Sequence, residues 1–96
     1  MMLLTKADRA KLLANGAKRD QDHKPVVKFF NPTGSATWLF TELDPSDGDT
    51  LFGLCDLGMG TPELGYASLA ELSRFRGRFG LGIERDRHFS ADKPLS

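Results

Sequence analysis

Three titratable side chains near the C-terminal end of this chain are spaced in a way that could support acid–base chemistry. Glu84, Asp86 and His88 alternate along the sequence, and a histidine titrates near neutral pH. In an extended stretch, Asp86 and His88 would point to the same side. No recognisable motif holds a serine or cysteine nucleophile beside them. We therefore expect structural or surface roles for these side chains, and we expect that the protein is not an enzyme.

Carboxylates dominate the middle of the chain. Residues 29–63 contain six acidic and no basic side chains, a sum of −6. Residues 1–28 hold seven basic and three acidic side chains, a sum of +4, and residues 64–96 hold six and four, a sum of +2. The chain is neutral overall, with 13 side chains of each sign. This balance excludes a strongly polybasic nucleic-acid-binding protein.

Two interpretations of the acidic middle stand side by side. In the first, Glu42, Asp44, Asp47 and Asp49 form a contact surface that a basic cleft on a partner would attract. In the second, they are solvated tips of a hairpin, balanced by Lys and Arg from the two ends. The aspartates near Gly48 do not have EF-hand spacing, so we expect turn carboxylates rather than calcium ligands. With two histidines and one cysteine, no metal site or cofactor is expected.

Arginines interleaved with phenylalanines form the best nucleic-acid-binding candidate. These arginines are Arg74, Arg76, Arg78, Arg85 and Arg87. Arg74 and Arg78 are four residues apart and would share a face of a helix. Such a cluster can bind phosphates while aromatic rings stack on bases. The alternatives are surface arginines paired with nearby carboxylates, or anchors of a protein interface.

The aromatic residues Trp38, Phe40 and Phe52 cannot be assigned to a sheet face before the strand register is known. On a face covered by helices they would be core residues. On an uncovered face they would mark a partner or dimer surface. Trp38 is therefore grouped with the acidic hairpin as a candidate contact residue.

Hydrophobic patterning predicts the elements that would position these side chains. They are a helix over 5–15, strands over 26–30, 36–43, 51–57 and 63–67, a helix starting after Ser68, and a brief extended segment over 81–84.

Local signals mark several ends of these elements. Thr5 with Asp8 predicts a helix start, and Gly16 predicts its stop by a left-handed conformation. Ser68 with Glu71 predicts a second capping box, and an apolar stripe should carry that helix past Phe75.

Between the second and third strands, Asp44 to Asp49 predicts a hairpin turn. Gly53 either makes room for a bulky neighbour or marks a bulge.

Composition places the chain among ordinary globular proteins. Hydrophobic residues make up 40% of it and charged residues 27%. We expect one domain over residues 1–96, with 1–4 and 90–96 frayed, and an α+β fold in which two helices pack on an antiparallel sheet of three to four strands. No apolar run is long enough to span a membrane, and no signal peptide is evident. A single cysteine, Cys55, fits a reducing cytoplasm.

Several segments, in order, resemble a bacterial family. The matching segments are Lys28-Phe29-Phe30-Asn31-Pro32, Thr37-Trp38, Thr41-Glu42-Leu43-Asp44-Pro45, Leu51-Phe52-Gly53-Leu54, Glu63-Leu64-Gly65-Tyr66, Ser68-Leu69-Ala70-Glu71-Leu72 and Gly80-Leu81-Gly82-Ile83-Glu84-Arg85-Asp86. The family is known as domain of unknown function 2958. The resemblance implies a small bacterial protein encoded on plasmids, phages and other mobile elements, and it implies no catalytic residue.

These observations lead to a functional expectation. We expect a non-enzymatic cytoplasmic protein, monomeric or homodimeric, that binds a protein partner. The mobile-element context implied by the resemblance suggests inhibition of a host defence nuclease complex, of the anti-restriction or anti-CRISPR type. The alternative is a small nucleic-acid-binding module that uses the arginines.

Overall fold

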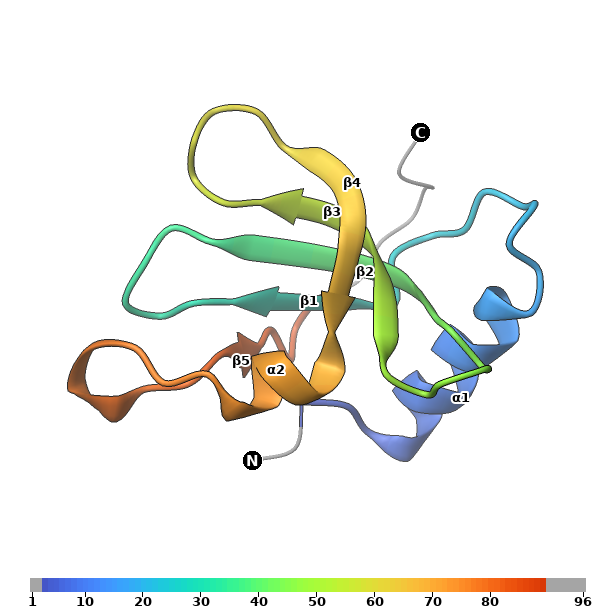
Figure 1. The fold of residues 1–96 in the computed structure, drawn as a ribbon, viewed down its shortest axis with the longest axis horizontal. Coiled ribbons are helices and arrows are strands. Elements are labelled where there is room, and N and C mark those ends of the chain that lie inside the picture. Colours follow the sequence, from blue (N-terminus) through green and yellow to red (C-terminus); the bar gives the residue numbers. More distant parts are fainter. Residues whose placement is uncertain (1–2, 90–96) are drawn as a thin grey trace.

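A curled antiparallel sheet with helices at one end forms the body of the protein (Figure 1). The computed structural model describes residues 3–89. Its elements are α1 (Lys6–Gly16), β1 (Val27–Phe30), β2 (Thr37–Leu43), β3 (Thr50–Asp56), β4 (Glu63–Ser68), α2 (Leu69–Arg74), the short 3-10 helix η1 (Arg78–Gly80) and β5 (Glu84–Arg85). The α+β class is confirmed, but the sheet has five strands where three to four were predicted.

The first helix starts as the sequence predicts and ends differently. The Thr5 hydroxyl accepts a hydrogen bond from the Asp8 backbone N–H, and the Asp8 carboxylate accepts one from the Thr5 N–H. At the other end, Gly16 is still helical, and the capping residue Ala17 has a right-handed φ of −77°. A Cβ on Gly16 would collide with the carbonyl oxygen of Leu43. Glycine is needed here for close packing of α1 on β2, not for the left-handed stop that was predicted.

The second helix is shorter than the apolar stripe suggested. Ser68 caps it by accepting a hydrogen bond from the Glu71 N–H at 3.2 Å, as predicted. The helix ends at Arg74, because Phe75 already has an extended ψ of 136°. Phe79, expected as a continuation of the stripe, instead lies in η1 with a φ of 60° and is 90% exposed.

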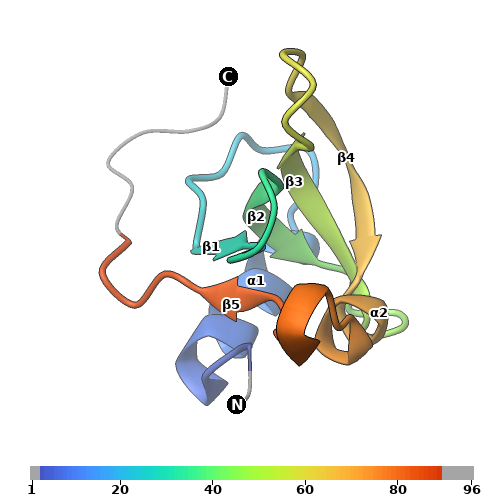
Figure 2. The same ribbon diagram turned by 90° about the vertical axis from the view of Figure 1, so that its left-hand side faces the viewer.

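Strands β1 to β4 form an antiparallel meander, and the last strand, β5, lies beside β1 at one edge of the sheet. The order across the sheet is β4-β3-β2-β1-β5, and every pairing is antiparallel. β5 pairs with β1 through Phe29 with Arg85 and Phe30 with Glu84. Figure 2 shows the sheet curving from β5 and β1 round to β4. The predicted extended segment, 81–84, shares only Glu84 with β5, because the two polar residues of β5 give no strand pattern.

Strand register assigns side chains to the two faces of the sheet. The inner face, which carries the core, holds Val27, Phe29, Trp38, Phe40, Leu43, Leu51, Gly53, Cys55, Glu63, Gly65 and Ala67. The outer face holds Lys28, Phe30, Leu39, Glu42, Phe52, Leu54, Leu64 and Tyr66. The register shifts between Phe40 and Glu42, so Thr41 is bulged. Gly53 pairs with Phe40 next to this bulge, and a Cβ on it would collide with the Leu39 carbonyl oxygen. Of the two alternative roles predicted for Gly53, the place beside a bulge is found, whereas the atoms that need the space belong to the backbone of Leu39 and Phe40 and not to a bulky side chain.

The core lies between the inner face and α1. Its buried members are Leu3, Leu4, Leu12, Val27, Phe29, Phe40, Leu43, Leu51 and Ile83. The rings of Phe29 and Phe40 meet edge to face, with centroids 5.6 Å apart. Leu3 and Leu4 are 5% and 7% exposed and belong to the buried core, so the expected fraying of residues 1–4 does not hold for these two residues. Residues 1–2 and 90–96, also expected to fray, lie outside the described residues.

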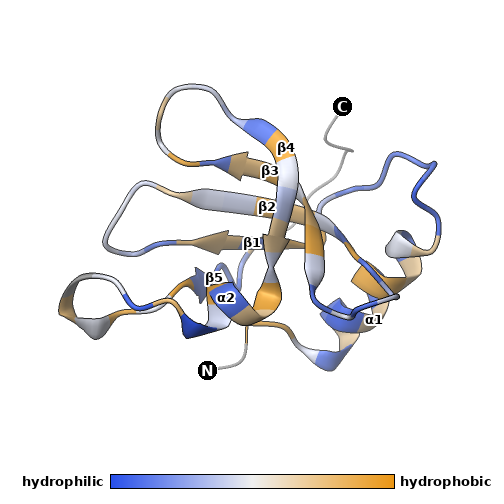
Figure 3. Ribbon diagram, viewed as in Figure 1, coloured by the Kyte–Doolittle hydropathy of each residue, from blue (hydrophilic) through white to orange (hydrophobic). Residues whose placement is uncertain are grey.

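Polar sequence follows the first helix. The connection from residue 17 to residue 24 is coloured hydrophilic almost throughout (Figure 3) and is a loop, as predicted. Among residues 3–89, no helix has the length and apolarity required to cross a membrane.

Candidate partner-binding groove

The hairpin aspartates are engaged by the backbone of their own turn. The Asp44 carboxylate accepts hydrogen bonds from the Ser46 N–H and hydroxyl, both at 2.8 Å. Asp47 accepts from the Thr50 hydroxyl at 2.6 Å, the Thr50 N–H at 2.9 Å and the Asp49 N–H at 2.8 Å. The bond from the Thr50 hydroxyl, followed by the backbone bonds, lowers the pKa of Asp47 from 3.8 to about 2. These carboxylates therefore build the turn that the sequence predicted.

Asp49 joins the hairpin to α2. Its carboxylate accepts hydrogen bonds from the Ser68 hydroxyl at 2.6 Å and from the Ala70 N–H at 2.8 Å. Its carbonyl oxygen accepts from the Leu69 N–H at 2.9 Å. The bond from the Ser68 hydroxyl is the main cause of a lowered pKa at Asp49. Asp49 thus satisfies backbone donors at the start of α2, which no helix carbonyl can reach.

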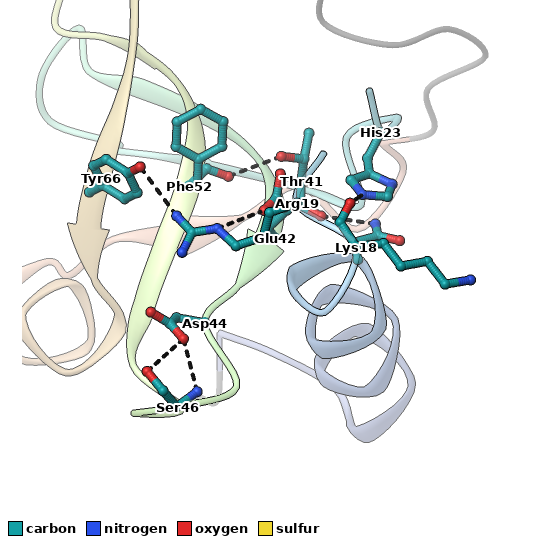
Figure 4. Close-up of polar contacts among 10 residues, drawn as sticks. Lys18, Arg19, His23, Thr41, Glu42, Asp44, Ser46, Phe52 and Tyr66 are labelled. Atoms are coloured by element: carbon teal, nitrogen blue, oxygen red, sulfur yellow. Dashed lines mark hydrogen bonds and ion pairs between the residues drawn. The ribbon is translucent and has the colours of Figure 1, made fainter. Parts of the chain in front are cut away.

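Glu42 lies on the outer face and is buried there by the loop that follows α1. Figure 4 shows Arg19 from this loop lying between Glu42 and Tyr66. The Arg19 Nε is 3.7 Å from the Glu42 carboxylate, and its Nη2 donates to the Tyr66 hydroxyl at 3.2 Å. Tyr66 also packs on Phe52, with ring centroids 5.0 Å apart. Burial raises the pKa of Glu42, while the charges of His23 and Arg19 oppose that rise.

Trp38 is separated from the acidic residues with which it was grouped. It lies on the inner face, half-buried, and pairs with Cys55 near the start of β2. The hairpin turn follows the other end of β2, about 20 Å along the strand from Trp38. Glu42 is near that end and points to the opposite face. The fold therefore does not bring Trp38, Glu42, Asp44, Asp47 and Asp49 together as one surface.

The arginines also diverge. Arg74 ends α2, whereas Arg78 begins η1, so the shared helix face predicted for them does not form. Arg76 is exposed, and its Nη1 donates to the carbonyl oxygens of Ser73 and Phe75. These donors serve the chain's own backbone at the end of α2.

Arg85 is used inside the molecule. Its Nη2 is 2.8 Å from the Asp8 carboxylate, with only 18% and 19% of the two side chains exposed. This ion pair ties β5 to the first turn of α1. Arg87 lies in the exposed turn that follows. Arg74, Arg76 and Arg85 thus sit in three different settings, and no common phosphate-binding surface follows from them.

The titratable triplet at β5 forms a turn rather than a pocket. The Asp86 carboxylate accepts a hydrogen bond from the His88 N–H at 2.9 Å and lies 4.0 Å from the Lys28 ammonium group. Glu84 pairs with Phe30 on the outer face. Neither of the hollows described below is lined by any of the three side chains. Within residues 3–89, no group of three or more His, Cys, Asp or Glu side chains is placed to hold a metal ion.

Two hollows lie on the inner face on either side of Trp38, and together we call them the Trp38 groove. The first, about 380 Å³, is lined by Trp38, Cys55, Leu57, Met59, Thr61, Glu63, Leu64, Gly65 and Tyr66. The second, about 470 Å³, is lined by Asn31, Ala36, Trp38, Tyr66, Ala67, Ser68, Glu71, Leu72, Phe75 and Ile83. Trp38 and the strand β4 contribute to both hollows, so the groove follows β4.

Small residues on β4 create this groove. Gly65 and Ala67 are the inner-face residues of β4 at its centre, and neither fills the space beside Trp38. A Cβ on Gly65 would meet only the Cys55 sulfur, at 3.8 Å. Burial raises the pKa of the Cys55 thiol, which keeps it neutral and apolar. The groove is therefore largely apolar, and an aromatic ring stands at its middle.

Charge in the groove has one sign. Glu63 lines the first hollow and Glu71 the second, and neither hollow has a Lys or Arg in its lining. Leu57, Met59 and Phe75 are 51%, 76% and 40% exposed at its borders. A ligand that covers these side chains would remove apolar surface from water.

Sequence reasoning identified Trp38 and missed the rest of the groove. The missed signal is the spacing of Glu63, Gly65 and Ala67, which leaves one face of a strand without a large apolar side chain. Where such a face of a strand lies over the core, its small side chains leave unfilled space between the strand and the core. The contributions of Phe75 and Ile83 could not be read in this way, because they depend on the end of α2 and on β5.

Comparison with known proteins gives a family and no function. Searches of curated proteins and of solved structures returned no match to the chain. A family model described as a protein of unknown function, DUF2958, matches residues 3–96, which is nearly the whole chain. The resemblance found in the sequence is thus confirmed, and the chain belongs to the DUF2958 family.

Proposed function

We propose that the protein is a non-enzymatic binding module that recognises a protein partner through the Trp38 groove. The observation that carries this proposal is the half-buried Trp38 between two apolar hollows, on a sheet face that the protein's own residues leave unfilled. Tryptophan is enriched among residues that dominate binding energy at protein interfaces. Each large apolar side chain that a partner placed in the hollows would contribute about 1.5–3 kcal/mol by leaving water.

This proposal moves the contact surface away from the acidic hairpin. Asp44, Asp47 and Asp49 already accept hydrogen bonds from the turn and from α2, so contacts within the protein account for these carboxylates without a partner. The nucleic-acid alternative gains no support, because Arg85 is paired with Asp8 and Arg76 donates to backbone carbonyl oxygens at the end of α2. Trp38 is the residue retained from the set that the sequence suggested.

The partner class follows from the family context. The resemblance implies carriage on mobile elements of bacteria, so we propose a cytoplasmic partner in the bacterial host. A host defence nuclease complex, inhibited in an anti-restriction or anti-CRISPR manner, is the first partner to test. The groove would act by capturing a segment of that complex rather than by mimicking DNA.

Affinity capture from the native host tests the proposal with two matched variants. Gly65→Val places a branched side chain in the groove, where there is space for it, and should abolish capture of the partner. Asp44→Asn combined with Asp47→Asn removes hairpin charge and keeps an acceptor oxygen in each turn, so it should leave capture unchanged. Thermal unfolding of each variant confirms that it is folded. Loss of the partner in the hairpin variant alone, or recovery of no partner by the wild type, would contradict the proposal.

A further inference from the structure

The edge of the sheet beside the Trp38 groove is open. β4 ends the strand order, and in the described part of the chain it pairs only with β3. Alternate N–H and C=O groups of an edge strand point away from its neighbour and can pair with another chain. Three of the six β4 residues, Glu63, Leu64 and Tyr66, are exposed. An unpaired edge thus runs along the side of an apolar groove.

We propose that the occupant of the groove is an extended peptide segment of the partner, which adds to the sheet as a strand against β4. The peptide segment carries two large apolar residues with one residue between them, so that each hollow receives one apolar side chain. Lys or Arg residues flank this apolar pair on both sides. This inference rests on the proposed function and names the kind of segment that the groove recognises. Strand addition of this type takes affinity from backbone hydrogen bonds and specificity from alternate side chains.

The spacing of the groove favours an extended segment. The first hollow is lined by Glu63, Leu64 and Gly65 from the beginning of β4, and the second by Ala67 and Ser68 from its end. Side chains at alternate positions of a strand lie about 6.6 Å apart on one face. An added strand that runs along β4 would therefore place one side chain in each hollow, with Trp38 between them.

The charge of the groove favours a basic segment. Glu63 and Glu71 stand at its two ends, with no basic side chain in the lining. Lys or Arg residues that flank the apolar pair would meet these carboxylates, and an acidic segment would be repelled at both ends.

The same side chains disfavour a second copy of this protein as the occupant. If β4 of another copy paired with β4, its inner-face residues would be Glu63, Gly65 and Ala67. None of these is large and apolar, so both hollows would stay empty, and additional carboxylates would approach the acidic ends. A partner with bulky side chains fits the space, and a symmetric dimer through β4 does not.

A displayed peptide library followed by fluorescence tests the proposal. The purified protein should enrich sequences with two apolar residues separated by one position and flanked by Lys or Arg. A synthetic peptide with two such leucines and lysines at both ends should then shift the emission of Trp38, the single tryptophan. Gly65→Val should weaken binding by tenfold or more, and replacing one leucine by alanine should have a similar effect. Glu63→Gln with Glu71→Gln should weaken it a few-fold.

Two modified peptides test the strand pairing itself. Each peptide is N-methylated at every second amide, and the two peptides carry the methyl groups at opposite sets of positions. Only one of these sets can face β4, so one peptide loses its hydrogen bonds to β4 and should lose binding. If both bind as well as the parent, or if the enriched sequences are helical or acidic while Trp38 still responds, the strand-addition proposal is overturned and the groove remains the site. If no peptide is enriched, the inference is likewise overturned, and affinity capture alone decides the proposed function. Binding that leaves Trp38 unchanged and survives Gly65→Val would overturn both.

Discussion

At the scale of single residues, the carboxylates in the middle of the chain lie in two opposite electrostatic environments. Asp47 and Asp49 accept hydrogen bonds from backbone and hydroxyl donors, which favours their charged forms and lowers the pKa of each. Glu42 is held against Phe52 and Tyr66 under Arg19, where burial disfavours the charged form and raises its pKa. A run of like charges in sequence thus becomes a set of individual structural contacts.

Asp47 should make stability depend on pH in the acid range. Its pKa is 3.8 without the fold and about 2 within it, so the unfolded state binds the proton more readily. The stabilisation is fully present above pH 3.8 and is lost as the pH falls toward about 2. Asp47→Asn cannot ionise, so the difference in unfolding midpoint between wild type and variant should shrink over this window. Thermal unfolding at several pH values measures it. A difference that stays constant down to the lowest pH would contradict this account of the turn.

At the scale of elements, the first half of the fold was more readable from sequence than the second. Thr5 and Asp8 predicted the start of α1, and the strand pattern predicted β2 and β3 with their hairpin. Local chemistry was sufficient in these cases. The role of Gly16 was wrong, because close approach to Leu43 is a tertiary contact that no neighbouring residue signals. β5 is defined by its pairing with β1 rather than by its own composition.

The candidate site depends still more on register. Trp38 was singled out by its residue type, but its face and its distance from the hairpin follow from the pairing of β2 with β3. The bulge at Thr41 places Glu42 on the outer face, opposite Phe52. Sequence alone could therefore name one residue of the groove and could not assemble the groove.

Two glycines on the inner face, Gly53 and Gly65, provide a matched pair of substitutions. Gly53→Ala should destabilise the protein by about 1–3 kcal/mol, because the new Cβ would collide with the backbone at Leu39. Gly65→Ala, on the adjacent strand at the paired position, should be neutral or stabilising by about 0.5–1 kcal/mol, since space is available and alanine costs less backbone entropy. Denaturant unfolding measures both. Equal losses at the two positions would show that the space beside Trp38 is not open.

At the scale of the whole molecule, the segregated charges of the sequence partly meet in space. Arg19, from the basic N-terminal segment, pairs with Glu42, and Arg9 donates to the Gly48 carbonyl oxygen in the hairpin. The basic C-terminal segment reaches back through Arg85 to Asp8. These contacts leave the Trp38 groove as a separate feature, with carboxylates at its ends and apolar side chains between them. The distribution of charge along the sequence therefore pointed to the hairpin as the contact surface, whereas the unfilled surface of the fold is the Trp38 groove.

Chemical-shift mapping of the labelled protein with its captured partner tests the groove most directly. The account predicts that the largest changes occur at the Trp38 indole N–H and at the amides of Gly65, Ala67 and Phe75, which line or border the two hollows. Changes confined to the hairpin turn over residues 44–49, or to the exposed arginines after α2, with the Trp38 indole unmoved, would contradict it.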